Sequence, residues 1–211
     1  MIIRNRPISK ANYINRERWN VAQSVEIVHT NSPGGLNPEN TKHALEVFMK
    51  YFEVNLESFR GKTILEIGGS NYPISAHAIG FKKAINIEPL YEQFSEESKL
   101  WIKEKGVQVI PLPFEDFETN ELFDEVWFFN VLQHVMANPR ELLQKAKRLG
   151  KIIRVFEPIN TGTNISHPWE ITQQMLKEVF PNEDIKIYRG GSAVGFHGHD
   201  CAYFSALTGL K

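Results

Sequence analysis

Thr63-Ile64-Leu65-Glu66-Ile67-Gly68-Gly69-Ser70-Asn71-Tyr72-Pro73 is the stretch that decides the fold of this chain. Its apolar, β-branched run ends beside an acid and two glycines, which predicts a strand followed by a tight turn. Glycine accepts positive φ angles and lets a ligand approach the backbone closely. The residues after Pro73 predict the start of a helix, whose first N–H groups are unpaired. Loops of this kind hold nucleotide-like ligands at the carboxyl edge of a parallel sheet, although paired glycines also occur in ordinary turns.

Four further predicted strands follow this stretch and alternate with predicted helices. They cover residues 84–89, 107–112, 123–130 and 151–157. The third of these is apolar enough for the buried middle of a sheet. The alternation indicates an α/β fold, namely a doubly wound, Rossmann-like, mostly parallel sheet with helices on both faces.

The helices are predicted from their caps and apolar spacing. One starts at Asn37-Pro38 and carries the apolar stripe Ala44, Leu45, Phe48 and Phe52, and three more follow at 92–103, after Asn138 and after Thr172. Two further strand candidates, 185–188 and 202–207, are joined by a glycine-rich loop. They predict a terminal antiparallel strand pair at one end of the sheet.

Residues 1–36 precede this pattern and have no place in it. Trp19, Ala22, Val25 and Val28 recur at three-residue spacing, which predicts a helix with one apolar face. Residues 32–35 (Ser-Pro-Gly-Gly) then break the chain. We expect one domain over residues 1–211 in which residues 1–36 are a helical lid or appendage. The alternative is a helix that packs on the sheet as core.

The composition is that of an ordinary soluble globular protein. Hydrophobic residues make up 42% and charged residues 23% of the 211 residues, and the formal net charge is -1. Nothing in this balance points to a nucleic acid or a membrane as partner. Cys201 is the single cysteine, so no intramolecular disulfide forms, and we expect a cytoplasmic location. The oligomeric state cannot be read from the sequence.

Glu88 ends the second predicted strand 20 residues after Gly68. In a βαβ nucleotide site, an acid at about this spacing accepts hydrogen bonds from ribose hydroxyls. The competing interpretation is a solvated charge at a strand end. We expect Glu88 to contact a ribose, and Pro89 to end the strand beside it.

These motifs together resemble the class I S-adenosylmethionine-dependent methyltransferases over roughly residues 60–207. The glycine stretch, Glu88, the segment 115–117 and the segment 123–135 follow the family's order and spacing, and the terminal strand pair matches its final hairpin. The resemblance implies S-adenosylmethionine as cofactor. The residues that it implies for cofactor binding are Glu66, Gly68, Gly69, Ser70, Asn71, Glu88, Pro89, Glu115, Asp116, Phe117 and Asn130.

The glycine loop departs from the family pattern of three alternating glycines. Gly68 fits the pattern, but Ser70 and Tyr72 occupy the other two positions. Tyr72 cannot easily adopt a positive φ angle. Either the loop runs differently or cofactor affinity is reduced, which leaves open a non-catalytic member of the fold.

Histidine and tryptophan residues are the candidates for the acceptor side. His134 follows the fourth strand, and an imidazole is easily poised as a base near neutral pH, so it is the candidate catalytic residue. His167 and Trp169 follow the fifth strand, where an imidazole and an indole suit a flat or cationic acceptor. For all of them, loop packing is the competing interpretation. The remaining substrate candidates are Trp19, His197 and His199.

The segment His197-Gly198-His199-Asp200-Cys201 contains residue types that bind metals. Gly198 weakens the regular alternation that would place the ligands on one face, and no distant partner motif exists. We therefore expect no metal site here.

The sequence as a whole predicts S-adenosylmethionine-dependent methyl transfer to a small-molecule acceptor. Aligning the acceptor and excluding water would be the main tasks of the protein. One alternative is a non-catalytic cofactor-binding module. Another is an NAD(P)-dependent oxidoreductase, which would need a fuller Gly-x-Gly-x-x-Gly motif. The sequence markers of DNA methyltransferases, Asn/Asp-Pro-Pro-Tyr/Phe and Pro-Cys, are absent.

Overall fold

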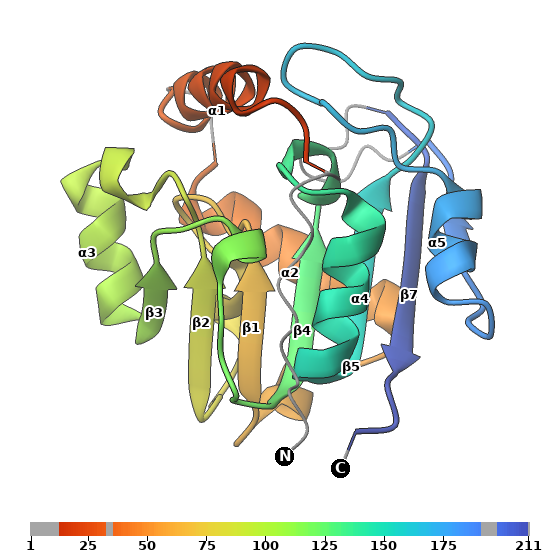
Figure 1. Cartoon of the computed structure of the whole chain (residues 1–211). Helices are drawn as coiled ribbons and strands as arrows, with labels where there is room; N and C mark the ends of the chain where they lie inside the picture. Colours follow the sequence, from red (N-terminus) through yellow and green to blue (C-terminus); the bar gives the residue numbers. More distant parts are fainter. Residues whose placement is uncertain (1–12, 33–35, 191–197, 211) are drawn as a thin grey trace.

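A computed structural model describes residues 13–32, 36–190 and 198–210 (Figure 1). Its seven strands form one sheet in the order β3-β2-β1-β4-β5-β7-β6. Strands β3, β2, β1, β4 and β5 are parallel to one another, and β7 pairs antiparallel with both β5 and β6. The strands are β1 (Thr63–Ile67), β2 (Lys83–Ile87), β3 (Val107–Ile110), β4 (Phe123–Phe129), β5 (Gly150–Pro158), β6 (Lys186–Tyr188) and β7 (Cys201–Leu207). The predicted mostly parallel sheet with a terminal antiparallel pair is confirmed.

Helices cover both faces of this sheet, as predicted. In Figure 1, α4 and α5 lie in front of the sheet and α2 lies behind it. Asn37 and Thr172 cap α2 and α5 with hydrogen bonds from Asn40 N (2.9 Å) and Met175 N (3.0 Å). The helices are α1 (Arg16–Thr30), α2 (Pro38–Phe52), α3 (Glu96–Glu104), α4 (Pro139–Leu149) and α5 (Gln173–Val179).

The strands are buried on both sides because each face has its own apolar core. Leu65 and Ile67 belong to the core under α4 and α5, whereas Ile64 of the same strand belongs to the core under α2 and α3. Successive side chains of a strand point to opposite faces, so a strand buried on both faces has a nearly continuous apolar run. This explains why residues 123–129 were recognisable as a central strand.

The helix predicted after the first strand is wrong. Between β1 and β2 the chain forms a single 3-10 turn, η3 (Ile74–His77), and then a loop to Gly80. The two carboxylate oxygens of Glu66 accept hydrogen bonds from Ile74 N (2.9 Å) and Ser75 N (2.8 Å). A side chain from the strand thus satisfies the N–H groups that would otherwise begin a longer helix.

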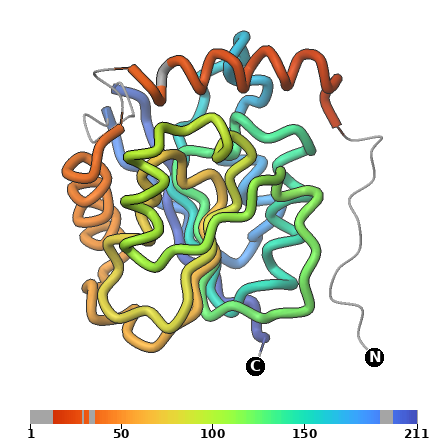
Figure 2. The backbone as a smooth tube through the Cα atoms, turned by 90° about the vertical axis from the view of Figure 1, so that its left-hand side faces the viewer, coloured from red at the N-terminus to blue at the C-terminus, as the bar shows by residue number. Residues whose placement is uncertain are grey.

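Helix α1 lies across the carboxyl ends of the strands (Figures 1 and 2). Of its predicted apolar face, Trp19 and Ala22 are buried, but Val25 and Val28 are 41% and 71% exposed. The predicted apolar face is therefore wrong in its second half. Gln23 and Thr30 are also buried, and neither Trp19 nor Ala22 belongs to one of the two apolar cores.

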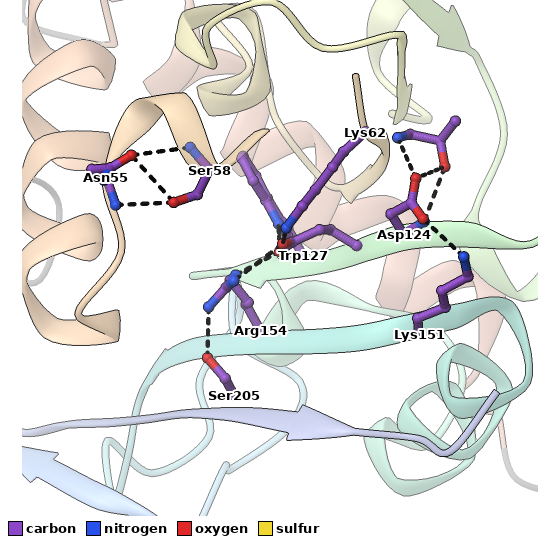
Figure 3. A network of polar contacts seen from close by, with 10 residues as sticks. Asn55, Ser58, Lys62, Asp124, Trp127, Lys151, Arg154 and Ser205 are labelled. Atoms are coloured by element: carbon purple, nitrogen blue, oxygen red, sulfur yellow. Dashed lines mark hydrogen bonds and ion pairs between the residues drawn. The ribbon is translucent and has the colours of Figure 1, made fainter. Parts of the chain in front are cut away.

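A network of charged groups ties the amino ends of β1, β4 and β5 together (Figure 3). Buried Glu125 forms ion pairs with Lys62 and Arg154, and it accepts a hydrogen bond from Trp127 Nε1 (3.1 Å). Asp124 accepts from Thr63 N (2.9 Å) at the same end. Because these charges pair with one another, their role at this edge is structural.

In the described part of the chain, no helix combines the length and apolar character needed to cross a membrane.

Candidate active site

Three cavities open between α1 and the carboxyl ends of the strands. The Glu88 cavity lies among the loops that follow β1, β2, β3 and β4. The Glu66 cavity lies between the loop after β1 and helix α2, and the His167 cavity lies between α1 and the loops after β4 and β5. Glu26 and Asn130 line all three, so the cavities meet at these two side chains.

The glycine loop approaches the loop after β4 very closely. Gly68 has a φ angle of 67°, and a Cβ atom added there would lie 2.2 Å from Cγ2 of Val131. Ser70 has a φ angle of 56°, whereas Tyr72 does not take a positive φ angle. Tyr72 instead packs its ring against Trp101, with the centroids 5.2 Å apart. Tyr72 therefore does not strain the loop, and Ser70 is the non-glycine residue in it that takes a positive φ angle.

Glu88 is buried at the end of β2 and faces the cavity named after it. Its two oxygens accept hydrogen bonds from Ser70 N (3.0 Å) and Leu90 N (2.9 Å). A carboxylate has about four lone-pair positions, so roughly two remain for a ligand. Burial raises the pKa of Glu88 to about 7, and the negative charges of Glu26 and Glu66 add to this effect.

Glu66 lines its cavity but already has backbone partners, because it holds the turn η3 as described above. Burial raises the pKa of this carboxyl, and the hydrogen bonds from Ser75 and Ile74 oppose the shift. In the structure Glu66 is therefore a strand-end acid that binds loop amides. Its place in the cavity wall keeps a ligand contact possible as well.

The loop after β3 is held from two sides. Oε1 of Glu115 accepts hydrogen bonds from Met136 N (2.9 Å) and Ala137 N (2.8 Å), which ties this loop to the loop after β4. Buried Lys145 of α4 donates to the carbonyl oxygens of Phe114 (2.8 Å) and Glu115 (2.9 Å). Burial lowers the pKa of Lys145 to about 8. Glu115 is thereby placed in the wall of the Glu88 cavity.

The loop after β4 is clamped by a buried acid from β5. Val131 N and Leu132 N both donate to the carboxylate of Glu157, at 2.9–3.2 Å. Burial raises the pKa of Glu157 to about 8. Asn130, just before these amides, has a φ angle of 57°, a conformation in which asparagine is enriched. The clamp therefore sets the position of Asn130 at the junction of the cavities.

Helix α1 is attached to the same loop through His134. The carbonyl oxygen of His134 accepts hydrogen bonds from Trp19 Nε1 (3.1 Å) and Gln23 Nε2 (3.3 Å). The imidazole Nδ1 lies 3.8 Å from Oε2 of Glu26, and the ring meets that of His167 edge to face at 4.8 Å. His134 thus joins the helix, the loop and two cavities.

Most residues predicted for the site line one of the three cavities. These are Trp19, Glu66, Gly68, Gly69, Ser70, Glu88, Pro89, Glu115, Asn130, His134, His167 and His199. The cavity linings do not include Asn71, Asp116, Phe117 or Trp169.

The four residues outside the linings have other roles. Asn71 donates to the carbonyl of Thr30 (3.4 Å), and Trp169 donates to the carbonyl of Val135 (2.8 Å). Phe117 is part of an apolar core, and Asp116 is exposed. His197 lies outside the described residues.

Glu26, Gln133 and Glu157 belong to the site but were not predicted. Glu26 and Gln133 line the cavities, and Glu157 positions Asn130. A sequence signal existed for Glu157, because it ends a buried strand as Glu66 and Glu88 do. Another existed for Glu26, since Trp19, Gln23, Glu26 and Thr30 share one helical face by their spacing.

We next consider whether Asp200 and its neighbours could bind a metal ion. Asp200 accepts hydrogen bonds from Arg189 Nη1 (2.7 Å) and Gly190 N (3.0 Å), and Cys201 is buried in β7. Within residues 13–32, 36–190 and 198–210, no three His, Cys, Asp or Glu side chains are grouped to hold a metal ion. His197 is outside these ranges, so the absence of a metal stays a prediction.

Comparison with known proteins rests on structure alone. No protein-family model matches the chain, and no curated protein matches it. Several solved structures do. The 1,6-didemethyltoxoflavin-N1-methyltransferase of Burkholderia thailandensis, with bound 1,6-didemethyltoxoflavin and S-adenosylhomocysteine, has a TM-score of 0.64 at 14% identity over 95% of this chain and 93% of that chain.

Two other solved structures show the same similarity. The N-methyltransferase NodS from Bradyrhizobium japonicum WM9, in complex with S-adenosylhomocysteine, has a TM-score of 0.60 at 15% identity over 88% of this chain and 97% of that one. The [4+2]-cyclase SpnF has a TM-score of 0.60 at 14% identity over 84% and 76% of the two chains. The chain therefore has the fold of the class I S-adenosylmethionine-dependent methyltransferases. Since a cyclase shares it, the reaction has to be argued from the site.

Proposed function

We propose that this protein is an S-adenosylmethionine-dependent methyltransferase that acts on a small-molecule acceptor. One observation carries the proposal: two cavities at the carboxyl ends of β1 to β4 meet a third at Glu26 and Asn130. A cofactor and an acceptor can therefore approach each other from separate cavities. In this fold, ligands bind at the edge where the strand order reverses, which is the β1–β4 boundary here.

The residues of the Glu88 and Glu66 cavities suit S-adenosylmethionine. Glu88 keeps lone pairs for the two ribose hydroxyls, and Gly68 and Ser70 of the loop after β1 line the same cavity. Leu90 and Met136 offer apolar contact for an adenine, next to Glu115. The bound cofactor would supply an electrophilic methyl group on a sulfonium ion. The tasks of the chain are then to orient the acceptor and to exclude water.

The His167 cavity suits the acceptor. His134, His167 and Gln133 line it, and all can form hydrogen bonds with a small polar molecule. Two of the structurally similar proteins are N-methyltransferases crystallised with S-adenosylhomocysteine, one of them with its small-molecule substrate as well. These proteins support the proposal by analogy of fold.

We also propose that α1 is a lid over these cavities. Trp19, Gln23 and Glu26 of α1 line the Glu88 cavity, and Val25 and Glu26 line the His167 cavity. A lid of this kind excludes water from the reacting groups. The exclusion of Trp19 from both apolar cores supports this role over that of a core helix.

The proposal is tested by calorimetric titration of S-adenosylhomocysteine into the wild-type protein and Glu88→Gln. The wild type should bind it, and the variant should lose about 1.5–3 kcal/mol because an amide offers one acceptor oxygen in place of two. Wild-type affinity should fall as the pH is lowered below about 7, since a protonated Glu88 cannot accept both hydroxyls.

Three outcomes would count against this assignment. Equal affinity of both proteins would remove Glu88 from the ribose site. Tighter binding of NAD than of S-adenosylhomocysteine would favour the oxidoreductase. Binding without transfer of a labelled methyl group to any acceptor would favour the non-catalytic module.

A further inference from the structure

Acidic side chains line the three cavities. Glu26, Glu66, Glu88 and Glu115 contribute carboxyl groups, and among the described lining residues there is no lysine or arginine. A cavity lined by one sign of charge and enclosed by apolar walls concentrates ligands of the opposite charge. The cavities therefore favour cationic ligands over anionic ones.

Glu26 differs from the other three carboxyl groups in its partners. Glu66, Glu88 and Glu115 each accept hydrogen bonds from two backbone N–H groups. Within the described residues, the polar contact of Glu26 is its approach to His134 at 3.8 Å, which is beyond hydrogen-bond distance. Its side chain is 31% exposed and lies where the cavities meet. Glu26 thus has lone pairs available to a ligand.

Gln133 supplies a second acceptor in the same place. Its Nε2 donates to Oδ1 of Asn130 (3.1 Å), which identifies the opposite atom, Oε1, as an acceptor. This oxygen is buried and has no hydrogen-bond partner among the described residues, and the side chain lines the His167 cavity. A buried oxygen without a partner is unfavourable, so this cavity suits a ligand that donates hydrogen bonds.

From these observations we infer that the methyl acceptor is a basic amine. Glu26 binds it as an ammonium ion, Gln133 accepts one of its N–H groups, and His134 takes the proton that it must lose. The inference rests on the proposed methyl transfer and adds the chemical class of the acceptor. The charge and the donor groups of an ammonium ion match the two acceptors in the wall.

The reaction balances with the groups present. The ammonium nitrogen has no lone pair until one N–H proton passes to the imidazole of His134, where Glu26 stabilises the resulting imidazolium. The nitrogen lone pair then forms the new N–C bond to the methyl group. The S–C bond breaks, and its electron pair stays on sulfur, which gives S-adenosylhomocysteine and a methylated ammonium ion. The proton on His134 finally leaves to water.

Oxygen acceptors fit the site less well. A phenol or carboxylic acid reacts as an anion, and Glu26 would face that anion with a like charge. During attack by an amine, the sulfonium charge passes to the nitrogen that is bound at Glu26. A carboxylate already in place there stabilises that charge without rearrangement.

The test is a methyl-transfer assay with radiolabelled S-adenosylmethionine and a panel of alkyl and aryl amines. Each amine is paired with the alcohol, phenol or carboxylate of the same carbon skeleton. We expect methylation of amines alone. For the best amine, Glu26→Gln should raise KM at least about tenfold, the effect of losing one charge-assisted contact. Affinity for S-adenosylhomocysteine should change far less.

The control is Glu17→Gln, which removes the same charge from an exposed position of α1 and should leave KM unchanged. Methylation of an oxygen acceptor, or of no amine by a protein that binds S-adenosylhomocysteine, would overturn the inference. An unchanged KM in Glu26→Gln would also overturn it, because Glu26 would then only hold α1 in place. A protein that does not bind S-adenosylhomocysteine would instead defeat the proposed function.

Discussion

Gly68 sets the distance between the two loops that frame the candidate cofactor site. We predict that Gly68→Ala costs about 2–4 kcal/mol of stability. The alanine must take a φ angle of 67°, and its Cβ must displace Val131, which otherwise lies 2.2 Å away. Because Val131 belongs to the clamped loop after β4, affinity for S-adenosylhomocysteine should fall as well. Chemical denaturation and calorimetry measure the two effects.

Gly61→Ala is the matched control for this substitution. Gly61 has a φ angle of 73°, but an added Cβ would meet no atom within 4 Å. It should cost only the backbone term of about 1–2 kcal/mol. The double variant Gly68→Ala/Val131→Ala should recover part of the loss. Equal effects at Gly61 and Gly68 would show that the contact with Val131 is unimportant.

Glu88 and Glu26 show which residues of the candidate site could be predicted from the sequence and which could not. The acid at the end of the second strand, Glu88, was predicted for the site from its spacing, and it lines the cavity. Glu26 was missed because the apolar spacing of α1 pointed to Val25 and Val28 instead. A helix over a polar cavity buries polar side chains, so the usual amphipathic pattern no longer indicates its inner face. The helical spacing of Trp19, Gln23, Glu26 and Thr30 marks this inner face, but their mixed polarity does not distinguish it from a solvated face.

Strand β5 controls the loop after β4 through Glu157, and this contact makes stability depend on pH. Burial raises the pKa of Glu157 from 4.5 to about 8 in the folded protein. Between these values the folded state holds a proton that the unfolded state has lost, so stability falls as pH rises. The contribution is complete below pH 4.5 and is lost as the pH passes about 8. We predict that Glu157→Gln removes a slope of up to about 1.4 kcal/mol per pH unit.

Urea denaturation from pH 5 to pH 8 measures this slope in both proteins. Other buried acids contribute to the wild-type slope, so the prediction concerns the difference between wild type and variant. The control is Glu178→Gln, because hydrogen bonds from Arg140 lower the pKa of Glu178 and its effect lies at more acidic pH. Identical slopes in wild type and Glu157→Gln would contradict the assignment.

Among the elements, the strands were predictable and the first crossover was not. The strands are buried on both faces, and their continuous apolar runs are visible in the sequence. The segment between β1 and β2 shows glycines and an acid, which also begin a helix in related folds. Here the carboxylate of Glu66 binds the amides of Ile74 and Ser75, and Gly80 with its φ angle of 64° ends the segment. A contact between β1 and η3 thus replaces the expected helix.

At the scale of the whole molecule, α1 is the element whose role follows from its place outside the layers. The sheet with α2 and α3 on one face and α4 and α5 on the other holds both apolar cores. Helix α1 adds to neither core and lies over the edge where the cavities open (Figure 2). The fold should therefore survive without it, whereas the closed site should not.

We predict that a variant beginning at Leu36 folds and melts within about 5 °C of the full chain. Removing a core helix would instead cost several kcal/mol of stability, and each kcal/mol lowers the melting temperature by about 2–4 °C. Affinity for S-adenosylhomocysteine should weaken, because Trp19, Gln23 and Glu26 leave the wall of the Glu88 cavity. Methyl transfer should be lost. The measurements are thermal melting, calorimetry and the labelled-methyl assay.

A full-length variant distinguishes the effect of detaching α1 from the effect of deleting the residues before Leu36. Trp19→Ala/Gln23→Ala removes both hydrogen bonds to the carbonyl of His134 but keeps the helix, and it should lower turnover in the same direction as truncation. Val21→Ala/Val28→Ala changes the exposed side of α1 and should leave turnover intact. If the truncated protein aggregates or melts far lower, α1 is a core helix after all. If the truncated protein keeps full turnover, α1 is not needed to exclude water from the reacting groups, and the lid proposal is wrong.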